Sequence, residues 1–180
     1  MTTTAAEAML ARRSMSKVTD EAPTREQLLA AIAAAGRVAD HSSLRPWRLI
    51  ELRGKDRERL GRAIHKAEHK HGISTKPLRA PLLIAVVAKV RKSGKVPDWE
   101  QEAVASGVAH MLSLALDEQG WGVFWRTGDY TRSKAVAKAH KLAKDERLLG
   151  WLYVGGKPVR DRDSHRKAID AESFLSPMPR

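Results

Sequence analysis

Cysteine is absent from this chain of 180 residues, and aromatic residues make up only 5% of it. Without cysteine, a disulfide framework, a thiolate nucleophile and a cysteine-ligated metal are all excluded. The few aromatic rings leave little for nucleic-acid bases to stack on. The longest strongly apolar run, 82–90, is too short to span a bilayer. No basic or apolar leader of the secretory kind opens the sequence, so we expect a cytoplasmic protein without a membrane partner.

Positive charge is in excess, with a formal net charge of +12. Such an excess is compatible with binding to nucleic acid or to another anionic surface. The Lys and Arg residues are spread along the chain, however, and they alternate with acidic residues over 55–59 and 144–147. We therefore favour a solvated cationic surface and expect no nucleic-acid partner. A basic nucleic-acid-binding domain is the less favoured alternative.

Helical and strand patterns interleave along the chain, which predicts a mixed sheet with helices on both sides. Thr24, followed by Gln27 three residues later, has the pattern of a capping box at a helix start. The continuous apolar stretch 82–88 predicts a central strand that is buried on both faces. The predicted helices cover 4–13, 24–37, 56–71, 98–119 and 133–142, and the predicted strands cover 47–52, 82–88, 123–125 and 149–154.

The length of the chain allows one domain with a proper core over residues 1–180. The tail, residues 158–180, shows no convincing core periodicity. His65 and His69 are four residues apart within a predicted helix, so they share a helix face that would suit a metal. No motif supplies an acidic or third ligand, so a solvated helix face is favoured and no metal site is expected.

Arg12, Arg13 and Ser14 end the first predicted helix. Two guanidinium groups can hold phosphate oxygens bidentately, and a serine hydroxyl adds a neutral donor. The segment is therefore a candidate phosphate site. Two arginines at a helix end also interact favourably with the helix dipole in the absence of any ligand. The residues alone leave both interpretations open.

Two further segments combine polar groups with a tryptophan. Residues 40–47 form a polar turn ending in Pro-Trp, which is either an ordinary connection or the rim of a pocket for a flat, heteroatom-rich ligand. Residues 125–128 end a strand at Gly128, which is either a simple turn or a strand end that offers backbone N–H groups to a ligand. No G-x-G-x-x-G fingerprint, Walker loop or G-x-S-x-G elbow is present. A nicotinamide nucleotide would therefore bind outside a Rossmann site.

In their order and spacing these segments resemble the nitroreductase family, and within it the small YdjA-like branch. The resemblance extends from about residue 9 to residue 155 and includes the stretches 79–82, 95–102, 120–122 and 150–155. It implies an α+β fold, with a mixed, largely antiparallel sheet flanked by helices. It also implies a homodimer with FMN bound at the subunit interface.

The resemblance also implies roles for individual residues. The arginine pair at the end of the first helix would lie near the FMN phosphate. Arg37 and His41 would reach the flavin bound mainly by the other subunit, and residues 125–127 would line it from the strand end. FMN itself would carry out the hydride transfer, so no catalytic side chain is assigned. The residues expected to bind FMN are Arg12, Arg13, Ser14, Arg37, His41, Trp125, Arg126 and Thr127.

The activity implied by the resemblance is that of an FMN-dependent NAD(P)H oxidoreductase. Hydride would pass from NAD(P)H through the flavin to a nitroaromatic, a quinone or a similar small aromatic acceptor in a ping-pong sequence. The chain departs from the family pattern at Ser16, Ser43 and Arg45, so contacts at the edge of the flavin ring are not assigned. The alternative is a non-catalytic flavin-binding or sensing relative with the same fold.

Overall fold

A four-stranded sheet lies at the centre of the computed structural model, which describes residues 4–159 and 168–178. The spatial order of the strands is β1-β2-β4-β3, and every neighbouring pair runs antiparallel. Parallel pairing occurs at an isolated bridge between Ser14 and Val123 of β3. The strand bounds are Trp47–Arg53 for β1, Leu82–Lys89 for β2, Trp121–Arg126 for β3 and Glu146–Gly156 for β4.

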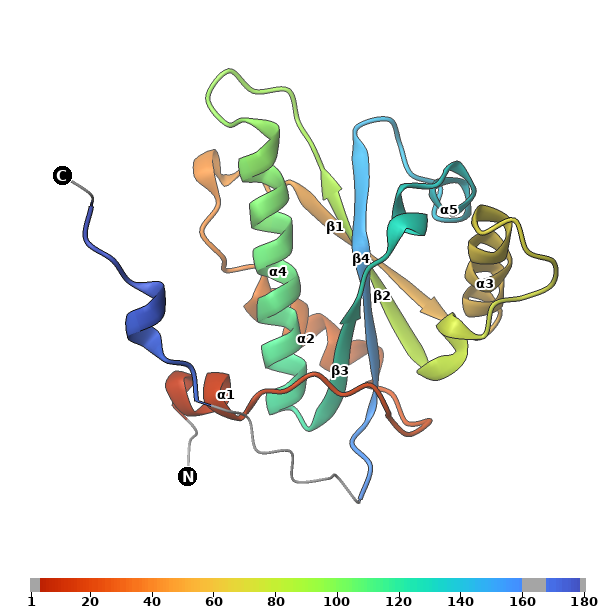
Figure 1. The fold of residues 1–180 in the computed structure, drawn as a ribbon, viewed down its shortest axis with the longest axis horizontal. Helices are drawn as coiled ribbons and strands as arrows, with labels where there is room; N and C mark the ends of the chain where they lie inside the picture. The colour runs from red at the N-terminus through yellow and green to blue at the C-terminus, as the bar shows by residue number, and fades with distance from the viewer. Residues whose placement is uncertain (1–3, 160–167, 179–180) are drawn as a thin grey trace.

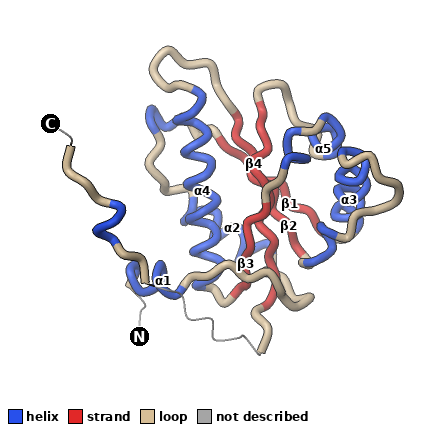
Figure 2. The backbone as a smooth tube through the Cα atoms, in the orientation of Figure 1, coloured by secondary structure: helices blue, strands red, loops and turns tan. Residues whose placement is uncertain are grey.

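Helices cover both faces of the sheet, as the sequence predicted (Figure 1). The tube view shows α2 and α4 on one side of the strands and α3 and α5 on the other (Figure 2). The α+β architecture expected from the resemblance is thereby confirmed. The helix bounds are Ala5–Ala11 for α1, Arg25–Ala35 for α2, Lys55–Ala67 for α3, Asp98–Glu118 for α4 and Lys134–Ala139 for α5.

The central strand β2 separates two apolar cores. Side chains alternate across a strand, so Leu82, Ile84 and Val86 face the core beneath α2 and α4. Leu83 and Val87 join the core beneath α3 and α5. Residues 82–88 are at most 1% exposed, which confirms the prediction of a strand buried on both faces.

Local sequence signals explain several element ends. The Thr24 hydroxyl accepts a hydrogen bond from the Gln27 backbone N–H, and the Gln27 side chain accepts one from the Thr24 N–H, so the predicted capping box starts α2. The same arrangement, between Thr4 and Glu7, starts α1. Strands β3 and β4 are longer than predicted. Gly122 lies inside β3 because the side chains of Met15 and Val18 pack against it.

The expectation that His65 and His69 share a helix face is wrong. Helix α3 ends at Ala67, and His69 has the left-handed φ of 55°, which turns the chain out of the helix. The His65 ring Nδ1 lies 2.8 Å from the backbone oxygen of His71. Within the described ranges, no group of His, Asp or Glu side chains is arranged to hold a metal ion.

The end of the chain carries little regular structure. Of the predicted tail, residues 160–167 and 179–180 lie outside the described part. The described remainder contains one 3-10 turn, Ala171–Phe174, and residues 168–178 are exposed. None of the helices that the structure describes is long and apolar enough to cross a membrane.

Candidate functional site

Ser14 lies alongside the first half of β3, one of the two edge strands of the sheet. It forms a parallel bridge with Val123, and the backbone N–H of Met15 donates to the Val123 oxygen at 2.8 Å. Arg12 is the C-cap of α1, so the helix ends where the phosphate candidate begins. The segment Arg12-Arg13-Ser14 is thus fixed against the sheet by the backbone of its neighbours.

Residues 125–127 lie at the other end of the same strand. Consecutive side chains of a strand point to opposite faces, so Trp125 packs into the α2/α4 core while Arg126 faces the other layer. The Arg126 guanidinium lies over two rings, 4.4 Å from the Phe124 centroid and 5.2 Å from that of Tyr153. Cation–π attraction of this kind holds the guanidinium in place.

Two buried polar atoms in this segment have no hydrogen-bond partner among the residues that the structure describes. They are Nε1 of Trp125 and Nε of Arg126, both of which are donors. Buried donors in folded proteins nearly always find an acceptor, in the protein, a water or a ligand. Both donors are enclosed by protein atoms, and Trp125 Nε1 lies against Gly150 of β4.

The path of residues 125–127 depends on Gly150 in β4. This glycine has a φ of +140°, next to a shift in the pairing register between Val86 and Val87 of β2. A Cβ atom at Gly150 would lie 2.5 Å from the Arg126 oxygen, 2.7 Å from Trp125 Nε1 and 3.1 Å from the Thr127 methyl carbon. Because Gly150 has no side chain, residues 125–127 can pack closely against its backbone in β4.

Helix α4 contributes a residue that the sequence did not indicate. His110 is exposed, and its ring meets the Trp125 indole edge-on, with centroids 5.0 Å apart at an angle of 76°. Edge-to-face contacts of this kind are favourable for aromatic rings. His110 has no nearby motif that would single it out. Gly150, in contrast, could have been found, because a glycine inside a strand often marks a close backbone approach.

The turn that follows α2 is strained. Ser42, Ser43 and Arg45 all have left-handed φ values, of 61°, 50° and 48°. The Asp40 carboxylate accepts from the Arg45 N–H at 2.7 Å, and the Asp40 backbone oxygen accepts from Ser43 at 3.0 Å. Non-glycine residues in this region cost free energy, and such costs concentrate at functional sites. The turn is thereby fixed in one shape.

His41 opens this turn and is tied to α4. Its Nδ1 lies 3.0 Å from the Glu100 carboxylate, near the start of the helix. Arg37, which is exposed, directly precedes Val38, and Val38 packs against Gly107 in the middle of α4. Both predicted partner-side residues thus lie along α4, on the α2 side of the molecule.

The structure brings some of the predicted residues together and keeps others apart. Ser14 bridges to Val123 in β3, and residues 125–127 cover the end of that strand and the position after it. Helix α1 lies near Asp117 at the far end of α4, whereas His41 contacts Glu100. Seventeen residues of helix separate these two positions, or about 25 Å at 1.5 Å per residue. Within one chain, therefore, His41 does not join Arg12 in a single small site.

Comparisons with known proteins identify the family of this chain. The sequence profile of the nitroreductase family matches residues 9–156. This chain belongs to the nitroreductase family. It is 36% identical over 159 residues to the Escherichia coli protein named "Putative NAD(P)H nitroreductase YdjA", covering 84% of this chain and 87% of that protein. The family consists of oxidoreductases, and the chain is accordingly an enzyme of that class.

Solved structures share the nitroreductase fold. A nitroreductase-like family protein from Bacillus cereus superposes with a TM-score of 0.82 at 20% identity, over 99% of this chain and 97% of the other. A mutant of NfnB, described as an FMN and NADPH-dependent nitroreductase from sphigopyxis sp. strain HMH, gives 0.79 at 15% identity, over 98% and 100%. At these identities the likeness establishes the fold.

Proposed function

We propose that this protein is an FMN-dependent NAD(P)H oxidoreductase and that β3 carries the cofactor contacts of one subunit. The observation that supports this proposal most directly is the meeting of two distant segments, 12–14 and 125–127, on a single strand. One segment supplies two guanidinium groups and a hydroxyl, and the other supplies buried donors that lack partners. A ligand with a phosphate at one end and a flat, acceptor-rich ring at the other fits this pair of segments.

In this proposal, Arg12 and Arg13 hold the phosphate of FMN, because arginine pairs with phosphate bidentately. Ser14 adds a hydroxyl donor, and the residues from Trp125 to Thr127 line the ring. Bound FMN supplies the hydride chemistry between NAD(P)H and the acceptor. The chain itself binds the phosphate, orients the ring and keeps the Trp125 indole fixed between His110 and Gly150. The NfnB relative is described as depending on FMN and NADPH.

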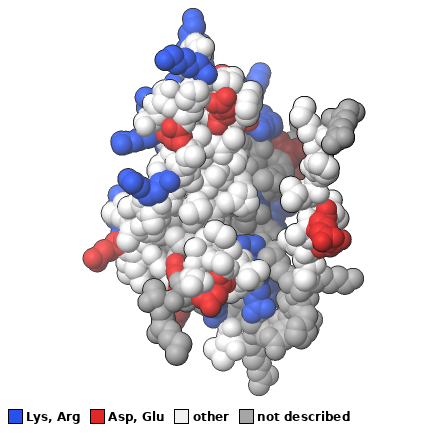
Figure 3. All heavy atoms as spheres, turned by 90° about the vertical axis from the view of Figure 1, so that its left-hand side faces the viewer, with Lys and Arg blue, Asp and Glu red and all other residues white. Residues whose placement is uncertain are grey.

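The proposed enzyme is a homodimer with Arg37 and His41 contributed by the partner subunit. Their distance along α4 from Arg12 supports this assignment, since both sets can contact one FMN only if they come from two chains. The face that carries α4 has few charged side chains in its middle (Figure 3). Large apolar side chains exposed on α1, on α4 and in the C-terminal residues are Met9, Leu10, Trp99, Met111, Phe174, Leu175 and Met178.

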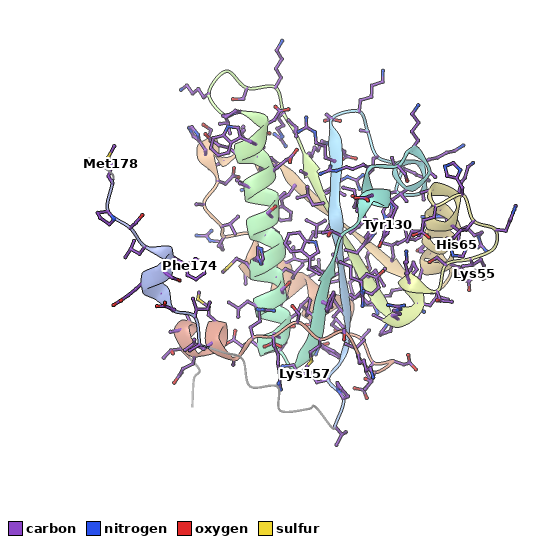
Figure 4. The ribbon with its side chains drawn as sticks, viewed as in Figure 1. Lys55, His65, Tyr130, Lys157, Phe174 and Met178 are labelled. Atoms are coloured by element: carbon purple, nitrogen blue, oxygen red, sulfur yellow. The ribbon has the colours of Figure 1, made fainter. Side chains whose placement is uncertain are left out.

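The C-terminal apolar residues support the dimer further. Phe174 and Met178 lie on a segment set apart from the sheet and its helices (Figure 4), and they are 82% and 91% exposed. Large apolar residues gathered on a surface mark contacts with another macromolecule. A second copy of this chain is the partner that the proposed two-chain site requires.

The proposed acceptors are nitroaromatics and quinones. A site that is shared in turn by the nicotinamide ring and the acceptor favours flat molecules that stack on the flavin. Positive charge from Arg45 and Arg126 near the two halves of the site favours anionic acceptors and the phosphates of the nicotinamide donor.

The visible spectrum of the purified protein tests the proposal. We expect a yellow protein whose absorption near the flavin bands is lost on anaerobic addition of NADPH or NADH and returns on addition of a quinone. Cofactor released by heat should co-migrate with FMN in chromatography. A colourless protein that takes up no FMN would contradict the proposal. A yellow protein that neither nicotinamide bleaches would support the non-catalytic alternative.

A further inference from the structure

A groove lined by positive charge runs between α3 and α5, on the face of the sheet opposite α4. It measures about 400 Å³, and no acidic residue is among the residues that line it. Its floor consists of alanines, and its walls carry cations from both helices. The lining residues are Arg59, Arg62, Ala63, Lys66, Ala135, Lys138, Ala139 and Lys141.

The helical repeat of the sequence places these cations together. Residues 59, 62 and 66 are three and four positions apart, so they share one face of α3. Lys138 lies in the last turn of α5, and Lys141 directly follows the C-cap of that helix. Helices α3 and α5 lie side by side (Figure 1), so the two rows of cations face a common space.

Neighbouring acids neutralise this charge only in part. Arg59 lies 3.4 Å from Asp56, and Arg62 lies 3.8 Å from Glu58, both as exposed pairs along α3. Within the ranges that the structure describes, Lys66, Lys138 and Lys141 form no ion pair. Like charges at helical spacing repel one another. A multivalent anion in the groove would relieve that repulsion.

One of these lysines occupies an unusual backbone position. Lys141 follows the C-cap of α5 and has a φ of 51°, in the left-handed region where helix ends usually carry glycine. A lysine there is less favourable for the backbone than glycine. The Lys141 side chain is the fifth cation that lines the groove.

We infer that the α3/α5 groove binds a chain of two or more phosphates. The alanine floor leaves room for a thin ligand, and two rows of cations can flank a series of tetrahedral anions. Arginine and lysine are the side chains that pair best with phosphate oxygens. Inorganic oligophosphates and the tails of nucleoside triphosphates share this chemistry. None of the residues that line the groove is among the proposed flavin contacts, so variants in the groove test this site separately.

Titration calorimetry with the protein as purified tests the inference. At 0.15 M salt we expect saturable binding of tripolyphosphate, with at least about a tenfold loss of affinity in the double variant Lys66→Gln/Lys138→Gln. The matched control, Lys92→Gln/Lys95→Gln, removes the same charge from the exposed loop before α4 and should bind within about twofold of the parent. Glutamine is a good helix former, and Lys92 and Lys95 are exposed in a loop, so both double variants should fold.

Two further ligands separate the sources of the phosphate. ATP binding that depends on Lys66 and Lys138, with no binding of adenosine, would place nucleotide tails among the ligands. If tripolyphosphate binds tightly and ATP does not bind, the site accepts only inorganic phosphate chains. The inference is overturned if tripolyphosphate does not bind, if both double variants lose affinity equally, or if a single-stranded oligonucleotide binds and tripolyphosphate does not.

Discussion

The indole of Trp125 lies directly over the backbone of Gly150, with Nε1 2.7 Å from the point that a Cβ atom would occupy. A side chain at position 150 must therefore displace the indole or the strand that carries it. We expect Gly150→Ala to lower the free energy of unfolding by about 1–3 kcal/mol and to weaken FMN binding.

Urea unfolding and an FMN titration measure these two effects. Gly94→Ala is the matched control, because a Cβ atom at Gly94 meets nothing within 4 Å. It should leave both quantities near those of the parent. If Gly150→Ala behaved like Gly94→Ala, the close packing of the candidate ring site would be in error.

Arg12→Ala tests the phosphate contact. A hydrogen bond to a charged group contributes about 1.5–3 kcal/mol, so we expect FMN affinity to fall by roughly 10- to 150-fold. Fluorescence titration of the apoprotein measures the dissociation constant. Arg91→Ala, in the exposed loop before α4, is the comparison and should bind FMN normally. Equal affinity in the parent and in both variants would remove Arg12 from the site.

Stability should depend on pH through His140. This buried ring accepts a hydrogen bond from Trp151 Nε1 at Nε2, at 3.0 Å, while Nδ1 lies 2.9 Å from the Val136 oxygen. Burial lowers the pKa of His140 below its ordinary 6.5. Protonating Nε2 would also break the bond from Trp151.

Below about pH 6.5 the unfolded chain therefore binds a proton that the folded protein excludes. The free energy of unfolding should carry the full contribution of His140 above this pH and lose it as the pH falls toward the lowered pKa. Urea unfolding between pH 5 and 8 should show a shallower loss in His140→Gln than in the parent. His71→Gln changes an exposed histidine and should show the same dependence of unfolding free energy on pH as the parent. If His140→Gln also shows the parent's dependence, His140 is not its source.

Steady-state kinetics should show that the donor and the acceptor bind in turn. The sequence has no dinucleotide fingerprint, so both molecules are expected to use one face of the flavin. Varying NADPH at several fixed quinone concentrations should give parallel double-reciprocal lines. Intersecting lines, together with a complex that holds both substrates, would rule out a shared face even with FMN bound.

Local signals predicted much of the fold. The capping box of Thr24 and Gln27 gave the start of α2, and the apolar run in β2 predicted burial on both faces. These features depend on neighbours within a few residues. The end of α3 was mispredicted, because the left-handed turn at His69 interrupts a charged pattern that continues in the sequence.

The sequence patterns indicated the separate segments of the candidate site but not which of their residues touch one another. Ser14 meets Val123 only through strand packing, and His110 meets Trp125 only because α4 crosses β3. Such contacts join residues far apart in the chain, and periodicity carries no information about them. The distance between His41 and Arg12 likewise follows from the length of α4, which no local pattern around either residue indicates.

The segment that carries Arg12 also shields an open sheet edge. Met15 donates to Val123 on the outer side of β3, and Thr19 donates to Gly156 at 2.9 Å. Unpaired edge strands recruit strands from other molecules and so promote aggregation. Proteolytic clipping before Val18 would expose the backbone of β3, and the clipped protein should precipitate as it loses its ligand. We therefore expect solubility and cofactor retention to depend on the same short stretch of chain.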